Sequence, residues 1–276
     1  MSTIAVQARR PGILTRAVIS VQDSLVVAQR NLMQIVRVPA VLVFELVQPV
    51  MFVLLFRYVF GGQFREMDAF GGYVNFLMPG IIVQNAIFGA TTTAIGIAED
   101  LKSGLVDRFR SLPMARSAML AGRATSDLIK NFILLLVVIG IAYLVGFAFR
   151  NGFVNALAMI VLVMAVSFAM SWVMAAIALS VKKLEAVQAA AFTGIFPLVF
   201  ISSALVRVPG MHPWLRGIAR NNPITHWANL ARYFAIGPFD EMGGSVTELI
   251  LLSGGWILVI LAIFMPLSIR LYSKLT

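Results

Sequence analysis

The stretch AEDLKSGLVDRFRSLPMARSAMLAGR, residues 98–123, lies between two long apolar runs and is the only long segment dense in charge. Within it, apolar residues recur at helical spacing: Leu101, Leu105, Phe109 and Leu112. This spacing places them on one face of a helix, with charged side chains on or near the other face. Pro113 predicts the end of that helix, because proline has no N–H to donate and clashes with the preceding turn. Ser117 is then expected to cap a second short helical piece.

We call residues 98–123 the elbow. An amphipathic segment between two apolar runs is not expected to sit in lipid, so the elbow should lie on a membrane surface or contact another protein, and we favour a protein. The alternative is a solvated charged loop that only joins two spans. We favour it less, because such a loop need not keep its apolar residues in helical register.

The composition of the chain is that of a membrane protein. Hydrophobic residues make up 60% of it and charged residues 12%, and the mean hydropathy is +0.91. A membrane-spanning helix needs about 20 consecutive apolar residues. Windows of this kind are residues 40–60, 74–98, 128–149, 154–181, 187–206 and 249–269. The sequence therefore predicts an all-α membrane protein with six transmembrane helices.

Three further segments complete the predicted fold. Residues 1–18 are expected to be disordered, and residues 19–276 to form a single transmembrane domain. Residues 19–38 have the pattern of a basic amphipathic helix that lies in the membrane interface. The stretch 207–244, rich in proline, glycine and tryptophan, predicts two short re-entrant or surface helices on the outer side.

The net charge of +10 is consistent with a membrane location. A basic chain could bind nucleic acid, but at this hydropathy the positive charge more simply marks cytoplasmic loops and anionic lipid headgroups. If the N-terminus is inside, 15 of the 22 Lys and Arg residues, Lys130 among them, fall on the cytoplasmic side. The positive-inside bias therefore predicts that both termini are cytoplasmic.

Polar residues within the predicted spans are candidates for a substrate path: Glu45, Gln84, Asn85, Thr91 and Thr92. An ionisable group in a span is costly, so Glu45 should face protein or water. Two alternatives remain open. Glu45 could reach the inner surface and pair with Arg37, and the threonine hydroxyls could bond to carbonyls of their own helix.

The sequence contains no pattern of a self-sufficient enzyme. It has no GxxxxGK[ST] phosphate loop, no HExxH and no GxSxG, and it has no cysteine. We therefore expect no catalytic residue. His212 and His226 are not expected to bind a metal, because no carboxylate or cysteine ligands accompany them. An energy source outside this chain must drive any active transport.

Several segments resemble ABC-2 type transporter permeases, in particular the daunorubicin/doxorubicin-resistance exporter branch. Glu99-Asp100 at the end of a span, Gly104 and DRFRSLPMARSAMLAGR are similar to the cytoplasmic segment of that family. RNLMQIVRVPAVLVFELVQPVMFVLLFRYVFGG, residues 30–62, resembles its connecting helix and first span. The run from Pro209 to Trp214 and the sequence NPIT at residues 222–225 resemble its outer loop.

This resemblance implies a non-catalytic six-span half transporter in the bacterial cell (inner or plasma) membrane. It implies a separate ABC ATPase subunit, which would carry ATP and Mg, while this chain would bind no cofactor. The elbow would be the docking surface for that ATPase, through Glu99, Gly104, Leu105, Arg108, Phe109, Arg110, Leu112, Pro113 and Arg116. The other implied partners are a second permease copy, identical or paralogous, membrane lipid and a small amphipathic cargo.

Two other functions fit the same sequence. One is an exporter of polysaccharide or cell-wall polymer with the same architecture. The other is a passive channel or scaffold with no ATPase. The sequence alone does not decide among them, because relatives of this family export drugs, glycolipids and polysaccharides.

Overall fold

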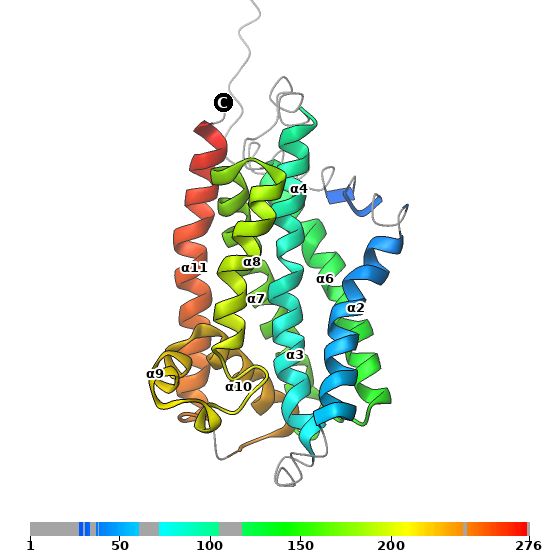
Figure 1. Cartoon of the computed structure of the whole chain (residues 1–276), viewed down its shortest axis with the longest axis vertical. Coiled ribbons are helices and arrows are strands. Elements are labelled where there is room, and N and C mark those ends of the chain that lie inside the picture. The colour runs from blue at the N-terminus through cyan, green and yellow to red at the C-terminus, as the bar shows by residue number, and fades with distance from the viewer. Residues whose placement is uncertain are drawn as a thin grey trace, which may run out of the picture.

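The computed structural model describes residues 28–29, 31–33, 37, 39–60, 72–104, 118–239 and 242–274, and every regular element among them is a helix (Figure 1). The elements are α2 (Pro39–Leu54), the π-helix η1 (Leu55–Phe60), α3 (Tyr73–Gly89), α4 (Thr91–Lys102), α6 (Ala118–Leu144), α7 (Gly152–Val181), α8 (Leu184–Phe200), the 3-10 helix η3 (Val208–Gly210), α9 (Pro213–Asn221), α10 (Pro223–Ile236) and α11 (Val246–Lys274). The predicted all-α fold is confirmed.

Five helical segments in the described residues are long and apolar enough to cross a membrane: Leu42–Val59, Tyr73–Lys102, Leu120–Leu144, Gly152–Val181 and Val246–Lys274. The sixth predicted span is a shorter helix, α8, with 17 residues. It begins earlier and ends earlier than the predicted window of residues 187–206. Its end follows from Asn222, whose Nδ2 donates to the carbonyls of Leu198 and Ile201, each at 2.7 Å, so these carbonyls are satisfied without a further helical turn.

The second predicted span consists of two helices, α3 and α4, that meet at Ala90. Pro79 lies inside α3, which continues past it to Gly89. At the junction, Thr91 Oγ1 donates to the Phe88 carbonyl at 2.6 Å and Thr92 Oγ1 donates to the Gly89 carbonyl at 2.7 Å. Such hydroxyl bonds compete with the helical ladder and favour a break. They also confirm the alternative that the hydroxyls of these threonines bond to nearby backbone carbonyls of their own span.

Helices α3 and α4 form the centre of the bundle, and α7 packs against both. Small residues allow close contact here. A Cβ added at Gly80 of α3 would lie 1.8 Å from the carbonyl oxygen of Ala204, which follows α8. In α7, Ala169, Ala175 and Ala176 are buried, which suits close packing of neighbouring helices.

Helix α10 also belongs to the core. Trp227 is 1% exposed, and α10 packs against α3, α7 and α11. Helix α9 instead leaves Trp214 and Ile218 exposed. Of the two short helices predicted between residues 207 and 244, one therefore lies at the surface and the other is buried within the bundle.

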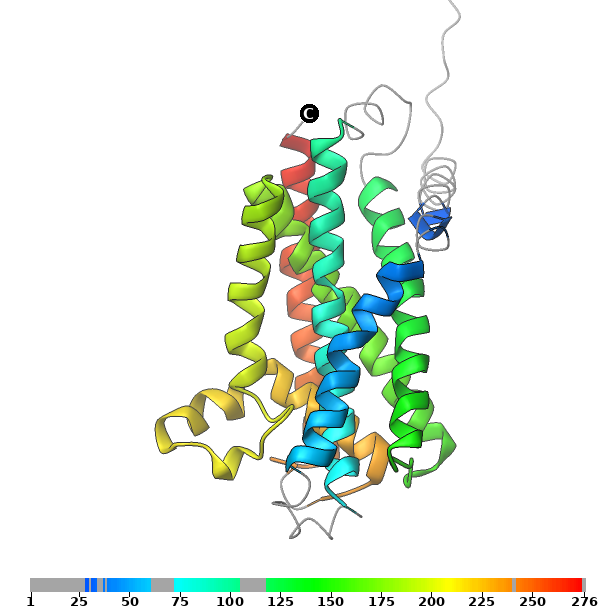
Figure 2. The same ribbon diagram turned by 45° about the vertical axis from the view of Figure 1, so that its right-hand side comes forward.

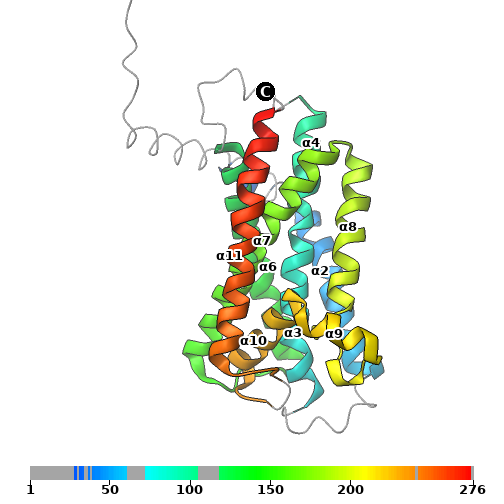
Figure 3. The same ribbon diagram turned by 90° about the vertical axis from the view of Figure 1, so that its left-hand side faces the viewer.

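The two ends of the bundle differ (Figures 1 and 3). The C-terminal end of α11, the end of α4 and the start of α6 lie at one end, and α9 and α10 lie at the other. The separate short helix predicted after Ser117 was wrong, because Ala118 begins α6, which continues for 27 residues. Residues 105–117 of the elbow lie outside the described residues.

Of the predicted interfacial helix, residues 28–29, 31–33 and 37 are described, and all are helical. Ala28 and Asn31 are buried, and Asn31 Nδ2 donates to Ser126 Oγ of α6 at 3.3 Å. The remainder of that helix and the segment 1–18 lie outside the described residues and stay predictions.

Candidate functional site

An ion pair joins α2 to α6 inside the bundle. Lys130 Nζ of α6 lies 3.0 Å from Glu45 Oε1 of α2 and donates a second hydrogen bond to Thr92 Oγ1 of α4 at 2.6 Å. The exposed fraction of the side chain is 4% for Lys130 and 18% for Glu45. The alternative pairing of Glu45 with Arg37 was wrong. Lys130, which we had counted with the cytoplasmic positive charges, lies within the helix bundle and neutralises an acid from another helix.

A second charged group joins the two ends of the elbow. Arg123 Nη1 of α6 is 2.9 Å from Asp100 Oδ2 of α4. One turn further along α6, Asp127 accepts a hydrogen bond from Thr93 Oγ1 of α4. Gly96 makes room for the guanidinium, because a Cβ at that position would lie 1.3 Å from Arg123 Nη2.

These two groups meet at the neighbouring residues Thr92 and Thr93 of α4 and together form a row of polar side chains, which we call the polar seam: Asp100, Arg123, Asp127, Thr93, Thr92, Lys130 and Glu45. It starts in the elbow, at Asp100 and Arg123, and ends at α2. Paired, hydrogen-bonded charges are tolerated within the low-dielectric interior, whereas single ones are not. The polar seam therefore connects the positions of α2, α4 and α6.

A cavity of about 110 Å³ adjoins the Glu45 end of the polar seam and is lined by residues of α2, α3, α4, α6 and α8. Figure 2 shows the ribbons of these helices. Its polar lining comes from Glu45, Gln48, Asn85, Thr91 and Thr92, and its aromatic lining from Phe44, Phe88 and Phe192. A second, smaller cavity shares Gln48, Asn85 and Phe88 with it and reaches Gln84. We call the two together the groove.

Aromatic rings continue the groove along α8. The centroid of Phe88 lies 5.3 Å from that of Phe196, and Phe196 stacks on Phe200 at 5.5 Å. Two buried acceptors near the groove, Glu45 Oε2 and Gln84 Oε1, have no hydrogen-bond partner in the part of the chain that the structure describes. The groove thus combines apolar walls with two hydrogen-bond acceptors that a bound molecule could use.

The structure brings four of the predicted substrate-path residues, Glu45, Asn85, Thr91 and Thr92, to one cavity and places Gln84 in the adjoining one. Sequence reasoning missed Lys130, Arg123, Asp127 and the three phenylalanines. A signal for the charged residues was present: positions 123, 127 and 130 fall on one helical face. No comparable signal singles out Phe88 and Phe192 in a chain with 20 phenylalanines.

Two predicted coupling residues are described. Glu99 is exposed near the end of α4, and Gly104 follows α4 with a φ of 69°, a conformation that favours glycine. The others, Leu105, Arg108, Phe109, Arg110, Leu112, Pro113 and Arg116, lie outside the described residues, so their role stays a prediction.

Comparison with known proteins identifies the class of molecule to which this bundle belongs. The model of the ABC-2 type transporter family matches residues 23–235, which is most of the chain. The chain belongs to the ABC-2 type transporter family. This ABC-2 permease is 29% identical to a daunorubicin resistance ABC transporter permease of Streptomyces coeruleorubidus over 88% of its own length and 83% of the relative's. It is 26% identical to a probable doxorubicin resistance ABC transporter permease of Mycobacterium tuberculosis, with 83% and 82% covered.

Membership in this family defines the general role of the chain. The ABC-2 permease is the non-catalytic, multi-pass membrane subunit of a transporter, and the family implies an ATPase partner subunit. The predicted resemblance to daunorubicin- and doxorubicin-resistance permeases is confirmed.

Proposed function

We propose that this permease subunit moves hydrophobic or amphipathic compounds (drugs, antibiotics or lipids) out of the bacterial cell, driven by a separate ATPase subunit. The names of two relatives, which refer to daunorubicin and doxorubicin resistance, support an amphipathic cargo. The chain has no phosphate-binding loop of its own, which supports ATP and Mg²⁺ on the partner subunit.

The groove is the observation that carries this proposal. An amphipathic molecule needs a mostly apolar site with a few polar groups that orient it. Phe88 and Phe192 supply apolar surface, and Asn85 and Thr92 supply polar groups on the same cavity. The cavity in one chain is smaller than a drug-sized site, so we propose that a second permease copy faces it and that the path lies between the copies. The exposed phenylalanines of α2 and α8, Phe44 and Phe196, support this arrangement.

The elbow is the proposed docking surface for the ATPase. It joins α4 to α6, and these two helices are linked by the polar seam. When ATP binding closes two ATPase subunits, a push on the elbow would move α4 and α6. Because Lys130 of α6 donates hydrogen bonds to both Thr92 of α4 and Glu45 of α2, a movement of α4 and α6 would also displace α2 and the wall of the groove. The elbow and both termini are proposed to be cytoplasmic, with α9 and α10 on the outer side.

The test is ATP-dependent uptake of a fluorescent amphipathic dye into inverted membrane vesicles that contain the permease and its candidate ATPase. We expect R108E/R110E to abolish uptake while the permease remains in the membrane. R9E/R10E makes the same charge change in the N-terminal segment and should leave uptake intact. Normal uptake with R108E/R110E would remove the elbow from the mechanism.

The same vesicles test the alternatives. ATP-driven transport of a polysaccharide, with no transport of the dye, would favour the polymer exporter. Failure of any ATPase to copurify with the tagged chain would favour a passive channel or scaffold.

A further inference from the structure

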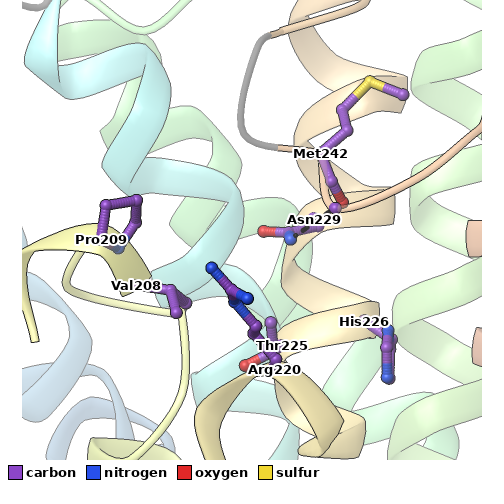
Figure 4. A pocket seen from close by; sticks show the side chains of 8 residues that line it. Val208, Pro209, Arg220, Thr225, His226, Asn229 and Met242 are labelled. Carbon is purple, nitrogen blue, oxygen red and sulfur yellow. Dashed lines mark hydrogen bonds between the residues drawn. The ribbon is translucent and has the colours of Figure 1, made fainter. Parts of the chain in front are cut away.

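A larger cavity, of about 390 Å³, lies at the other end of the bundle and takes no part in the function proposed above (Figure 4). It is enclosed by η3, the C-terminal end of α9, the first half of α10 and the backbone around Met242 and Gly243. Its volume falls within the range of small-molecule sites, about 300–1,000 Å³. Its polar lining comes from Arg220, Thr225, His226 and Asn229.

The free polar groups of this cavity are hydrogen-bond donors. Among the residues that the structure describes, the Arg220 guanidinium and the His226 ring have no hydrogen-bond or ion-pair partner. Thr225 Oγ1 accepts from the Ser203 N–H at 3.0 Å, which leaves its own hydroxyl hydrogen free to donate. In Figure 4 the Arg220 side chain points toward the space between Val208 and Asn229.

The side-chain oxygen and nitrogen of Asn229 beside the cavity are already used. Asn229 Oδ1 accepts from Ser203 Oγ at 2.8 Å and from Arg232 Nη1 at 2.9 Å. Asn229 Nδ2 donates to the Met242 carbonyl at 3.3 Å. A ligand that itself offers acceptors would therefore complement this cavity better than one that offers donors.

The local charge is positive. Behind Asn229, the Arg232 side chain is fully buried, and the groups that it contacts among the described residues are neutral: the carbonyls of Phe76, Ser203 and Ala204, Ser203 Oγ, Asn229 Oδ1 and the ring of Phe76. Burial lowers the pKa of His226, an effect that Glu248 of α11 partly opposes. The negative charge of Glu248, close enough to act on His226, would repel an anion bound in the cavity.

The position of the cavity suits the boundary of a membrane. Helix α9 carries the exposed Trp214 and Ile218 and ends next to the cavity with Arg220. Tryptophan is enriched at the depth of lipid headgroups, where the phosphates lie. Arginine donates paired hydrogen bonds that match the geometry of phosphate oxygens.

We propose that this cavity binds a phosphate group, carried by a lipid headgroup or free in solution, with the Arg220 guanidinium as its main contact. Thr225 and His226 donate further hydrogen bonds to the same group. The exposed apolar face of α9 contacts the acyl chains when the phosphate belongs to a lipid.

The test uses the full-length permease in detergent micelles, with bound lipid measured by native mass spectrometry. The probes are phosphatidylglycerol, diacylglycerol with the same acyl chains, and inorganic phosphate. We expect phosphatidylglycerol to be retained in preference to diacylglycerol, R220Q to weaken its retention by about tenfold, and R220K to have an intermediate effect, because lysine keeps the charge but not the paired donors. E248Q should strengthen retention.

R216Q is the matched control, because Arg216 lies one turn earlier on α9, does not line the cavity and donates to the Met211 carbonyl instead. Displacement of phosphatidylglycerol by inorganic phosphate would assign the contact to the phosphate alone, and lack of displacement would assign it to the lipid as a whole. Equal retention of diacylglycerol, unchanged retention in R220Q, or an equal loss in R220Q and R216Q would overturn the proposal. The unfolding temperature of each variant shows whether its fold is intact, and R220K provides the comparison if R220Q does not fold.

Discussion

Lys130 of α6 and Glu45 of α2 form an ion pair 85 residues apart in sequence, with Lys130 Nζ 3.0 Å from Glu45 Oε1. Each charge makes the other tolerable within a bundle of apolar helices. Glu45 Oε2 remains without a hydrogen-bond partner among the described residues, so the pair is not fully satisfied. This ion pair links α2 to α6 and leaves Glu45 Oε2 able to accept a hydrogen bond from a further donor.

Removal of one member of this pair should cost more than removal of both. We expect K130M to lower the free energy of unfolding by about 3–5 kcal/mol, because it leaves the Glu45 carboxylate buried and unpaired. The double variant E45Q/K130M should recover a large part of that loss. Thermal unfolding in detergent measures both, and K183M, at an exposed position before α8, is the control. Equal stability of K130M and the control would contradict the account.

Gly96 is expected to be sensitive to a single added methyl group. In G96A the new Cβ would collide with the Arg123 guanidinium, so Arg123 must move away from Asp100. Overpacking of this kind typically costs about 1–3 kcal/mol. We also expect a loss of ATP-dependent transport in vesicles, because the ion pair between Arg123 and Asp100, which joins the two ends of the elbow, is disturbed.

G140A provides the matched control for G96A. Gly140 lies in the interior of α6, and a Cβ there would meet nothing within 4 Å. Its stability and transport should match those of the unchanged protein. If G96A and G140A have the same stability and the same transport rate, the close approach of Arg123 to Gly96 is not important for either property.

Hydropathy was sufficient to predict where the long helices lie, because each contains its own apolar residues. It could not predict the end of α8, which depends on Asn222, a residue beyond the helix whose side chain binds the α8 carbonyls. The break at Ala90 was missed for a related reason. The predicted span of residues 74–98 is apolar on both sides of Ala90, so hydropathy does not mark the junction, where the hydroxyls of Thr91 and Thr92 bond to the carbonyls of Phe88 and Gly89.

The candidate site was predicted in part for the same physical reasons. Polar residues within apolar windows are conspicuous, so Glu45 and Asn85 could be selected from the sequence alone. Their partners could not, because pairing across helices depends on rotation and depth. Lys130 lies at the edge of a predicted span and was assigned to the cytoplasmic surface, whereas α6 begins at Ala118 and carries it into the bundle.

Arg232 should be among the least replaceable residues of the bundle. It is fully buried and donates to the carbonyls of Phe76, Ser203 and Ala204, which joins α10 to α3 and to the segment after α8. R232M would leave these carbonyls without donors, and each buried unsatisfied group costs about 1–3 kcal/mol. We expect little folded protein from R232M in fluorescence-detected size-exclusion chromatography and partial recovery from R232K. R270M, at an exposed position near the end of α11, should elute as the unchanged protein does. A well-folded R232M would show that the carbonyls find other donors.

The aromatic wall of the groove should control the affinity for cargo. Phe88 lies between Phe192 and Phe196 and lines both cavities of the groove, so F88A removes apolar surface where the proposed cargo binds. The loss of a buried phenylalanine contact corresponds to about 1.5–3 kcal/mol. We therefore expect the KM for an amphipathic dye in ATP-driven vesicle uptake to rise by at least about tenfold. The ATPase rate in the absence of dye should not change, because Phe88 lies in α3, and the elbow begins in the last turns of α4.

F153A separates this effect from a general loss of aromatic surface. Phe153 begins α7 and is 83% exposed, and it lines neither cavity of the groove. Its KM should equal that of the unchanged permease. Substitution of Asn85 by leucine offers a second comparison on the groove itself, because it keeps the volume but removes the polar group, and should raise the KM for dyes with hydrogen-bonding groups more than for purely apolar dyes. If F88A, N85L and F153A all give the same KM, the groove is not the cargo path and the cargo site must lie elsewhere in the transporter.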